Sequence, residues 1–232
     1  MEKPAIFRYE QKYLIKRYQY EEIRRVIGQL LERDPHVGDQ EDYMIRSLYF
    51  DDMYDSAYKE KLDGVYARKK YRIRVYNCGD SIIHLECKHK RGAYIFKESV
   101  PLTRAEYENI LEGDGGFLLK RKEAIAREFY VDMRTKLLRP RVIVDYDREP
   151  YISEAGTVRV TFDKEVRAAK PEENLFNPDA PSYTVYPPDE MILEIKFTGY
   201  LPEGIRRIFK VRNFTQVSAS KYCLCLDRIR LV

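Results

Sequence analysis

The feature that most constrains the fold is an alternation of basic and apolar side chains in residues 66–76, which read YARKKYRIRVY. Successive residues of a β-strand point to opposite faces, so this pattern predicts a strand with one cationic and one apolar face. The cationic face carries Lys70, Arg72 and Arg74, and the apolar face carries Tyr71, Ile73 and Val75. Such a cationic face is either solvated at the surface or turned toward an anion, and this segment alone does not decide between the two.

The same alternation recurs in other short segments rich in β-branched and aromatic residues, which predict strands. The expected strands are 6–16, 45–51, 67–77, 81–90, 93–100, 141–149, 157–164 and 190–198. Arg91-Gly92 predicts a tight hairpin between two of them. Several polar faces carry a glutamate two positions before a lysine, as in Glu10 and Lys12, Glu86 and Lys88, and Glu194 and Lys196.

Helical patterns fall between and after the strands. The expected helices are 19–33, a short helix from Thr103 to near Gly113, 117–137, 202–210 and 217–227. Five prolines mark 166–189 as a long irregular segment. These patterns predict a single α+β domain over residues 1–232 whose antiparallel strands could close into a barrel.

Composition limits which partners the basic residues can serve. The chain has 42 Lys and Arg against 38 Asp and Glu, for a net charge of +4, so any role of the basic residues depends on their concentration in one place. They are interleaved with glutamate and lack an aromatic stacking platform, which argues against nucleic acid.

The printed sequence also suggests a compartment. Cys78, Cys87, Cys223 and Cys225 show no zinc spacing and predict free thiols in a reducing environment. The first residues contain no apolar core of a secretory signal, and no stretch approaches the roughly 20 apolar residues of a membrane span. We therefore expect a cytoplasmic protein.

Two arrangements explain the charged strand faces. They could be solvated outer faces, which is the ordinary arrangement for any one strand. Alternatively, the strands could form a closed barrel with a charged interior and an apolar exterior covered by helices. A charged interior would have to be wet and occupied by an anion, because buried unpaired charges are costly. Arg and Lys bind phosphate oxygens and Glu suits Mg²⁺ or Mn²⁺, so this arrangement indicates a triphosphate or polyphosphate.

A set of motifs resembles a known family over nearly the whole chain, in the order in which that family carries them. They are RYEQKY (8–13), RSLYFD (46–51), RKKYRIRVY (68–76), LECKHK (85–90), FKES (96–99), DYDREPY (145–151), VRVTFD (158–163), ILEIKF (192–197) and SASKY (218–222). Together they resemble the VTC domain, the polyphosphate polymerase branch of the triphosphate tunnel metalloenzymes, a CYTH-like superfamily.

The resemblance implies an eight-stranded antiparallel tunnel with a charged interior, flanked by helices. It also implies that the terminal phosphate of a nucleoside triphosphate, usually ATP, is transferred to inorganic polyphosphate with Mn²⁺ or Mg²⁺. The implied catalytic residues are Arg72, Arg74, Arg148, Arg159 and Lys88. The implied substrate-binding residues are Lys12, Lys97, Tyr146, Lys196, Ser220 and Lys221. The implied metal ligands are Glu194, Glu86 and Glu10.

Two positions depart from patterns found in this superfamily. Arg8 stands where many members open with a Glu-x-Glu-x-Lys pattern, which fits the polymerase branch better than the triphosphatases and cyclases. Ser218 stands where eukaryotic polymerases tend to carry a further basic residue. Those enzymes also have membrane segments, so coupled transport would require a membrane-protein partner.

Two other functions remain open from the sequence. An enzyme of the same fold could use water as acceptor and act as an inorganic or nucleoside triphosphatase. A non-catalytic polyphosphate-binding module would use the same cations but would gain nothing from a metal-binding carboxylate at Glu194. Neither the polymerase nor the triphosphatase would need a Ser, Cys or His nucleophile, because phosphoryl transfer depends on positioning and charge stabilisation.

Overall fold

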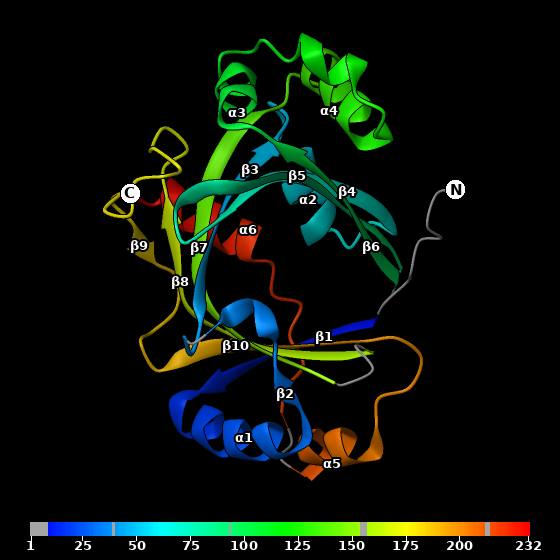
Figure 1. Ribbon diagram of the computed structural model, residues 1–232, viewed down its shortest axis with the longest axis vertical. Coiled ribbons are helices and arrows are strands. Elements are labelled where there is room, and N and C mark those ends of the chain that lie inside the picture. The colour runs from blue at the N-terminus through cyan, green and yellow to red at the C-terminus, as the bar shows by residue number, and fades with distance from the viewer. Residues whose placement is uncertain (1–8, 39, 93, 154–156, 212–213) are drawn as a thin grey trace.

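A strongly curved antiparallel sheet forms the body of the molecule in the computed structural model (Figure 1), which describes residues 9–38, 40–92, 94–153, 157–211 and 214–232. Eight strands follow one another across the sheet: β1 (Tyr9–Lys16), β10 (Glu190–Phe197), β8 (Val158–Ala169), β7 (Arg139–Ile152), β3 (Tyr43–Asp51), β4 (Ala67–Tyr76), β5 (Gly79–Arg91) and β6 (Tyr94–Leu102). Two short strands lie off this path: β2 (Glu32–Arg33) pairs with β7, and β9 (Tyr183–Thr184) with β8.

The eight strands wrap around a central opening, and the two edge strands, β1 and β6, come near each other on one side (Figure 1). Among the described residues no backbone ladder joins these two strands, so the expected closed barrel is corrected to a curved but open sheet. Side chains bridge the gap instead. Lys88 of β5 donates to Glu10 of β1 at 2.8 Å, and the rings of Tyr9 and Tyr94 lie 6.0 Å apart.

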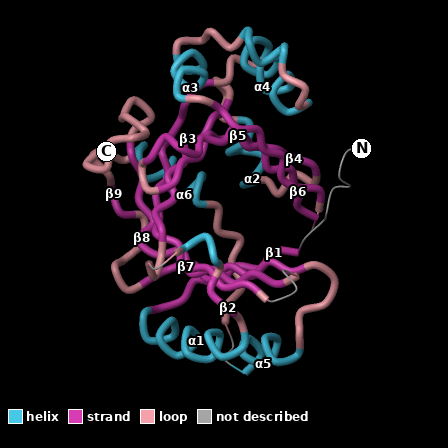
Figure 2. Tube along the Cα trace, in the orientation of Figure 1, coloured by secondary structure: helices cyan, strands magenta, loops and turns pink. Residues whose placement is uncertain are grey.

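Most helices cover the outside of the sheet, whereas the last one lies inside the central opening (Figure 2). α1 (Arg17–Leu30) and α5 (Glu203–Val211) lie below β1, β8 and β10, whereas α3 (Arg104–Leu111), the 3₁₀ helix η2 (Gly116–Lys120) and α4 (Ala124–Thr135) lie above β5 and β6. α2 (Ser56–Leu62) packs near β4, and α6 (Lys221–Arg230) packs on β7 and β8. A second 3₁₀ helix, η1, spans Pro35–Val37. None of the described helices is long and apolar enough to cross a membrane.

On β1, β4, β5, β8 and β10 an apolar face packs outward against helices. Ile23 and Ile27 of α1 are fully buried against Val160 and Leu193 of the sheet. On the other side Phe129 of α4 is fully buried in the cluster that contains Ile73 and Leu85. Burying each such side chain contributes about 1.5–3 kcal/mol. The alternate faces of these strands point toward the interior of the curved sheet and carry most of the charged residues. Near α6 the inner face also carries apolar residues, such as Val144 and Ile192.

Several element boundaries differ from those expected from the sequence. The helix expected at 117–137 is two helices, because the chain turns extended at Arg121, whose carbonyl accepts from Arg127 at 2.6 Å. The helix expected at 217–227 begins at Lys221. β8 continues to Ala169, so the irregular segment starts later than residue 166. The hairpin at Arg91-Gly92 is confirmed, with Gly92 at φ 57°.

α2 was not expected, and side chains from the preceding strand explain why it forms. The two carboxylate oxygens of Asp51 accept from the backbone amides of Ala57 and Tyr58 at 2.9 and 3.0 Å, and Asp52 accepts from the amide of Ser56 at 2.9 Å. Carboxylates in these positions satisfy the free amides of a helix N-terminus. Strand β3 thereby fixes the start of the helix that follows it.

Arg8 lies outside the described residues.

Candidate functional site

The interior of the curved sheet contains a cavity of about 1270 Å³ lined mainly by charged side chains. Thirteen of the fourteen site residues expected from the sequence line it, from Lys12 on β1 to Lys221 on α6. Glu86 is the exception. The charged strand faces therefore converge on one internal space, which excludes the alternative that they are all solvated outer faces.

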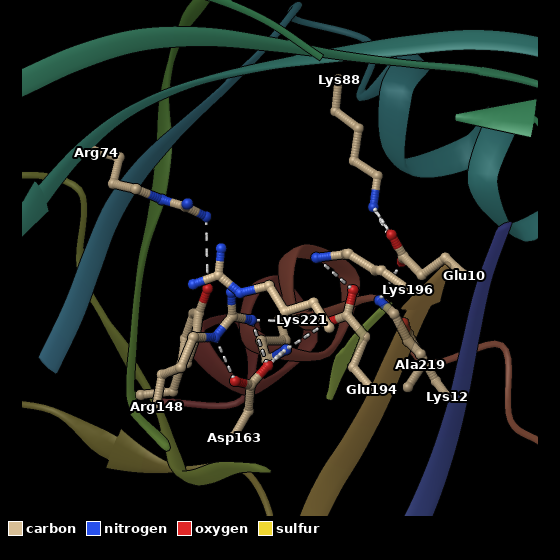
Figure 3. A network of polar contacts seen from close by, with 12 residues as sticks. Glu10, Lys12, Arg74, Lys88, Arg148, Asp163, Glu194, Lys196, Ala219 and Lys221 are labelled. Carbon is tan, nitrogen blue, oxygen red and sulfur yellow. Dashed lines mark hydrogen bonds and ion pairs between the residues drawn. The ribbon is translucent and has the colours of Figure 1, made fainter. Parts of the chain in front are cut away.

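One wall of the cavity is built from β1 and β10, which pair in antiparallel register (Figure 3). Glu10 lies opposite Lys196, and Lys12 lies opposite Glu194. Both strands carry the order Glu-x-Lys. Antiparallel pairing therefore gives each carboxylate two neighbouring ammonium groups, one on its own strand and one on the paired strand. Lys12 contacts Glu10 at 3.2 Å, and Lys196 contacts Glu194 at 2.9 Å.

Both glutamates on this wall are ionised at neutral pH. Burial raises the pKa of Glu194, but Lys196, Lys12 and Lys221 outweigh it and hold that pKa well below its usual range. Burial and the neighbouring Glu194 raise the pKa of Glu10, yet Lys88 and Lys12 lower it to about 2. The two carboxylates are close enough to influence each other and face the same cavity.

A buried aspartate organises the next part of the wall (Figure 3). Arg148 donates two hydrogen bonds to Asp163, at 2.7 and 2.8 Å, and Lys221 forms an ion pair with the same carboxylate. Asp163 is fully buried, and these two cations hold its pKa at about 2 although burial raises it. Asp163 was not among the expected site residues, although it shares the polar face of its strand with Arg159.

Tyr146 lies among the cations of this wall. Its ring centroid is 4.6 Å from Lys221 Nζ and 5.1 Å from the guanidinium carbon of Arg148, and its hydroxyl accepts from Arg74 at 3.4 Å. Burial raises the pKa of Tyr146, but Arg148 and Arg74 outweigh it and lower the pKa below its ordinary value. The ring of Tyr146 thus contacts two positive groups, and its hydroxyl contacts a third.

Glu86 serves as an anchor for cations on β4 and β6. It is 1% exposed and accepts from Arg72 Nε at 2.7 Å; it also pairs with Lys97 and lies 3.7 Å from Arg74 Nε. These cations outweigh burial and lower its pKa far below the ordinary value. Glu86 does not line the cavity, and its contacts fix the directions of the two arginines. Tyr49, which was not expected, accepts from the other end of Arg72 at 2.8 Å.

Two arginines of the cavity wall retain unused hydrogen-bond donors. The Nε atoms of Arg74 and Arg159 are buried and have no hydrogen-bond partner within the described part of the chain. Both side chains line the cavity. Buried donors are nearly always satisfied in folded proteins, so a pair of unsatisfied guanidinium donors beside a cavity indicates a site for an anion.

The segment before α6 contributes the remaining expected residues. Ser220 occupies the N-cap of α6, and its hydroxyl accepts from Lys70 at 3.1 Å. Lys61 of α2 donates to Ser218 at 2.8 Å. Ser220 and Lys221 both line the cavity at the N-terminus of α6. Helix N-termini favour anions because their first amides are free. Lys61 and Lys70 were not expected as site residues.

A geometric metal cluster lies elsewhere on the sheet. Ligand atoms of His89, Glu98 and Glu128 lie within 4.8 Å of one another, where β5 and β6 face α4. Lys69 pairs with Glu128 and so competes with a cation there. Glu10 and Glu194 do not belong to a group of three such ligands within the described part of the chain. The four cysteines are buried free thiols, as expected.

Comparison with known proteins agrees with this arrangement. A family model described as the VTC domain matches residues 7–229. Among solved structures, a "putative adenylate cyclase" from Bacillus halodurans is similar with a TM-score of 0.56 and 16% identity, over 94% of this chain and 96% of that one. A "putative adenylate cyclase" from Vibrio parahaemolyticus is similar with a TM-score of 0.52 and 11% identity, over 95% and 98%. No curated protein sequence matches the chain.

The two structural neighbours share the fold of this chain, and identities this low support nothing more specific. The family match is of a different kind, because it spans nearly all of the chain, from the first described strand to the last helix. The structure accordingly places almost every family motif on the wall of one cavity. The chain belongs to the VTC domain family.

Proposed function

We propose that this protein is a polyphosphate polymerase that transfers the terminal phosphate of ATP to a growing inorganic polyphosphate chain inside the cavity. The observation that supports the proposal is the charge of the cavity wall. The wall contains an excess of cations, several fixed by buried carboxylates, together with unsatisfied guanidinium donors at Arg74 and Arg159. Membership of the VTC domain family supports a phosphate-containing substrate.

The proposed roles follow from how each side chain is held. Arg72 is fixed between Glu86 and Tyr49, and Arg148 is fixed by Asp163, so their remaining N–H groups are oriented before a substrate arrives. Arg74 and Arg159 would donate to phosphate oxygens through Nε groups that have no hydrogen-bond partner among the described residues. Such preorganised donors stabilise charge on a transferring phosphoryl group without reorganising during the reaction.

The attacking atom would be a terminal oxygen of phosphate or polyphosphate, which needs no protein nucleophile. The P–O bond to this oxygen forms as the bond between the γ-phosphorus and the β–γ bridging oxygen breaks. The products are ADP and a chain longer by one phosphate. Lys88 and Lys97, which lie opposite each other on β5 and β6, would neutralise the incoming chain.

Glu194 and Glu10 fit a divalent cation. Mg²⁺ and Mn²⁺ are commonly held by one or two carboxylates together with substrate phosphates, and both glutamates are ionised and line the cavity. A bound Mg²⁺ or Mn²⁺ supplies neutralisation of charge on the phosphate oxygens. Lys196 and Lys12 hold the two carboxylates in place from adjacent positions.

A second candidate function is a triphosphatase of the same fold, in which water replaces the phosphate acceptor. The same cavity would serve, and the volume of about 1270 Å³ leaves room for water beside a triphosphate. The size of the cavity favours the polymerase, because it exceeds the roughly 300–1,000 Å³ of most small-ligand sites. A binding module without catalysis would not use the ionised Glu194.

Product analysis separates these functions. The purified protein is incubated with ATP and Mn²⁺ or Mg²⁺, and the products are compared with a sample treated with an exopolyphosphatase. The polymerase predicts ADP and a phosphate ladder that the exopolyphosphatase removes. ADP and orthophosphate without a ladder would indicate the triphosphatase, and no consumption of ATP with either metal would indicate a binding role. Arg74→Ala is the matched inactive control.

A further inference from the structure

Three side chains able to bind a metal ion meet where β5 and β6 face α4. His89 of β5, Glu98 of β6 and Glu128 of α4 each offer one ligand atom, and these atoms lie within 4.8 Å of one another. We call these three residues the α4 triad. Glu98 alone of the three also borders the cavity. None of them has a role in the proposed phosphoryl transfer, so the triad calls for a separate explanation.

The imidazole of His89 is held firmly but lacks a hydrogen bond at one nitrogen. Its ring stacks on Phe96, with the centroids 4.3 Å apart and the planes 2° from parallel. The Nε2 atom is buried and makes no hydrogen bond within the described part of the chain. Glu98 Oε2 lies 2.8 Å from it, so the direction of the contact, and not its length, is wrong for a hydrogen bond. A buried, unsatisfied ring nitrogen beside carboxylates is suited to bind a cation.

The charges around the α4 triad are not balanced. Lys69 pairs with Glu128 and contacts Asp132 at 2.6 Å, and Lys136 contacts Asp132 at 3.0 Å. Together with Glu98, three carboxylates therefore share two ammonium groups in this part of the described chain. A cation bound between Glu98 and Glu128 would offset the excess of negative charge.

Lys69 competes with a cation for Glu128, but it has other partners. Besides Glu128 it contacts Asp132, and it donates to the hydroxyl of Tyr71 at 3.1 Å. The side chain of Glu128 is 42% exposed, so it can turn from Lys69 toward an ion. Lys69 would then keep Asp132 and Tyr71, and its charge would remain paired.

We propose that the α4 triad is a zinc site, separate from the position of Mg²⁺ or Mn²⁺ at Glu194. One imidazole and two carboxylates supply three protein ligands, and water completes the tetrahedral coordination that Zn²⁺ prefers. Tetrahedral Zn²⁺ holds such ligand atoms roughly 3.3 Å apart, which small rotations of the two glutamates can reach. The imidazole favours Zn²⁺ over Mg²⁺ and Mn²⁺.

The bound ion would connect three elements, because each ligand comes from a different one. β6 is the edge strand of the sheet, and α4 follows it in the chain after α3 and η2. Zinc at the α4 triad would therefore stabilise the packing of α4 against this edge. The inference does not depend on the proposed function.

Zinc titration of the purified protein tests the proposal. Isothermal titration calorimetry is run with Zn²⁺ in an excess of Mg²⁺, which occupies carboxylate sites that lack an imidazole. His89→Ala and Glu128→Gln should each weaken zinc binding at least about tenfold, because each removes one of three ligands. His84→Ala is the matched control, since it removes an imidazole of the same strand outside the triad, and it should change the affinity less than about twofold.

A fourth variant should act in the opposite direction. Lys69→Met releases Glu128 from its competing partner, so zinc should bind more tightly than in the wild-type protein. Thermal melting gives a second readout: Zn²⁺ at about 100 times its Kd should raise the wild-type Tm by about 5–10 °C and should not raise that of His89→Ala at the same concentration.

Two results would overturn the proposal. Absence of zinc binding by the wild-type protein would show that the triad is not a site. Wild-type zinc affinity in both His89→Ala and Glu128→Gln would show that the ion binds elsewhere. Melting of each variant without zinc confirms that it is folded.

Discussion

Lys70 should make polyphosphate binding depend on pH in a defined way. Burial lowers the pKa of Lys70 to about 7, and the cations Lys88, Lys12 and Arg72 contribute in the same direction. Its hydrogen-bond partner is the neutral hydroxyl of Ser220. A polyphosphate chain beside Lys70 would favour the ammonium form and raise its pKa in the complex.

The sign and size of the effect follow from proton linkage. Below pH 7 Lys70 is protonated in both the free and the bound protein, so it adds no pH dependence to the affinity for polyphosphate. Above pH 7 the free protein has lost the proton and must take it up on binding. Affinity should therefore fall about tenfold, or about 1.4 kcal/mol, for each pH unit until the pH reaches the raised pKa of the complex.

Calorimetry measures this uptake directly. Titrations with long-chain polyphosphate at pH 8, in two buffers of different ionisation enthalpy, give the number of protons bound. Lys70→Arg is the matched control, because arginine keeps its charge over this range and the ligand's own titration cancels in the difference. We expect the wild-type protein to take up close to one proton more than the variant. Equal uptake, with equal slopes of affinity against pH, would refute the placement of Lys70 beside the polyanion.

Three substitutions test other contacts of the cavity. Arg74→Ala should lower turnover by about 10²–10³-fold, and retention of full kcat would contradict its role. It should change the unfolding free energy by less than about 1 kcal/mol, because the Arg74 hydrogen bond to Tyr146 is long, at 3.4 Å, and Glu86 keeps its ion pairs with Arg72 and Lys97. Glu194→Gln should raise the metal concentration for half-maximal activity about tenfold, measured by Mn²⁺ titration, and an unchanged requirement would exclude Glu194 as a ligand. Asp163→Asn should destabilise the protein by about 3–5 kcal/mol in urea unfolding, since Arg148 and Lys221 lose their nearest carboxylate and are left with Glu194 at 3.6 and 3.9 Å. Wild-type stability would show that Asp163 is not the anchor.

The alternation of charged and apolar residues predicted the central feature of the fold because it is a local property of each strand. Residues on the polar face of a strand must share one side of the sheet, and the apolar face must be covered. The order Glu-x-Lys on both β1 and β10 similarly allowed the pairing of Glu10 with Lys196, once the strands were antiparallel. Eleven of the thirteen expected site residues on the cavity wall lie on strands and follow this rule, whereas Ser220 and Lys221 lie at the start of α6.

The alternation pattern could not predict how deeply each side chain is buried or which distant segments are in contact. Glu86 lies on the polar face as expected, but Arg72 and Lys97 enclose it. Alternation does not tell which side chains of a polar face reach the cavity and which are covered by their neighbours. Lys61 enters the cavity from α2, a helix whose start depends on side chains of β3. The gap between β1 and β6 depends on the curvature of the whole sheet, which no single strand encodes.

The location of the triphosphate is the central claim, and a crystal structure with Mn²⁺ and a non-hydrolysable ATP analogue tests it most directly. Anomalous scattering would locate the manganese independently of the phosphates. We predict phosphate groups among Arg74, Arg148 and Lys221, with a manganese peak beside Glu194. Phosphates bound outside the cavity, or manganese only at His89 and Glu128, would contradict the account.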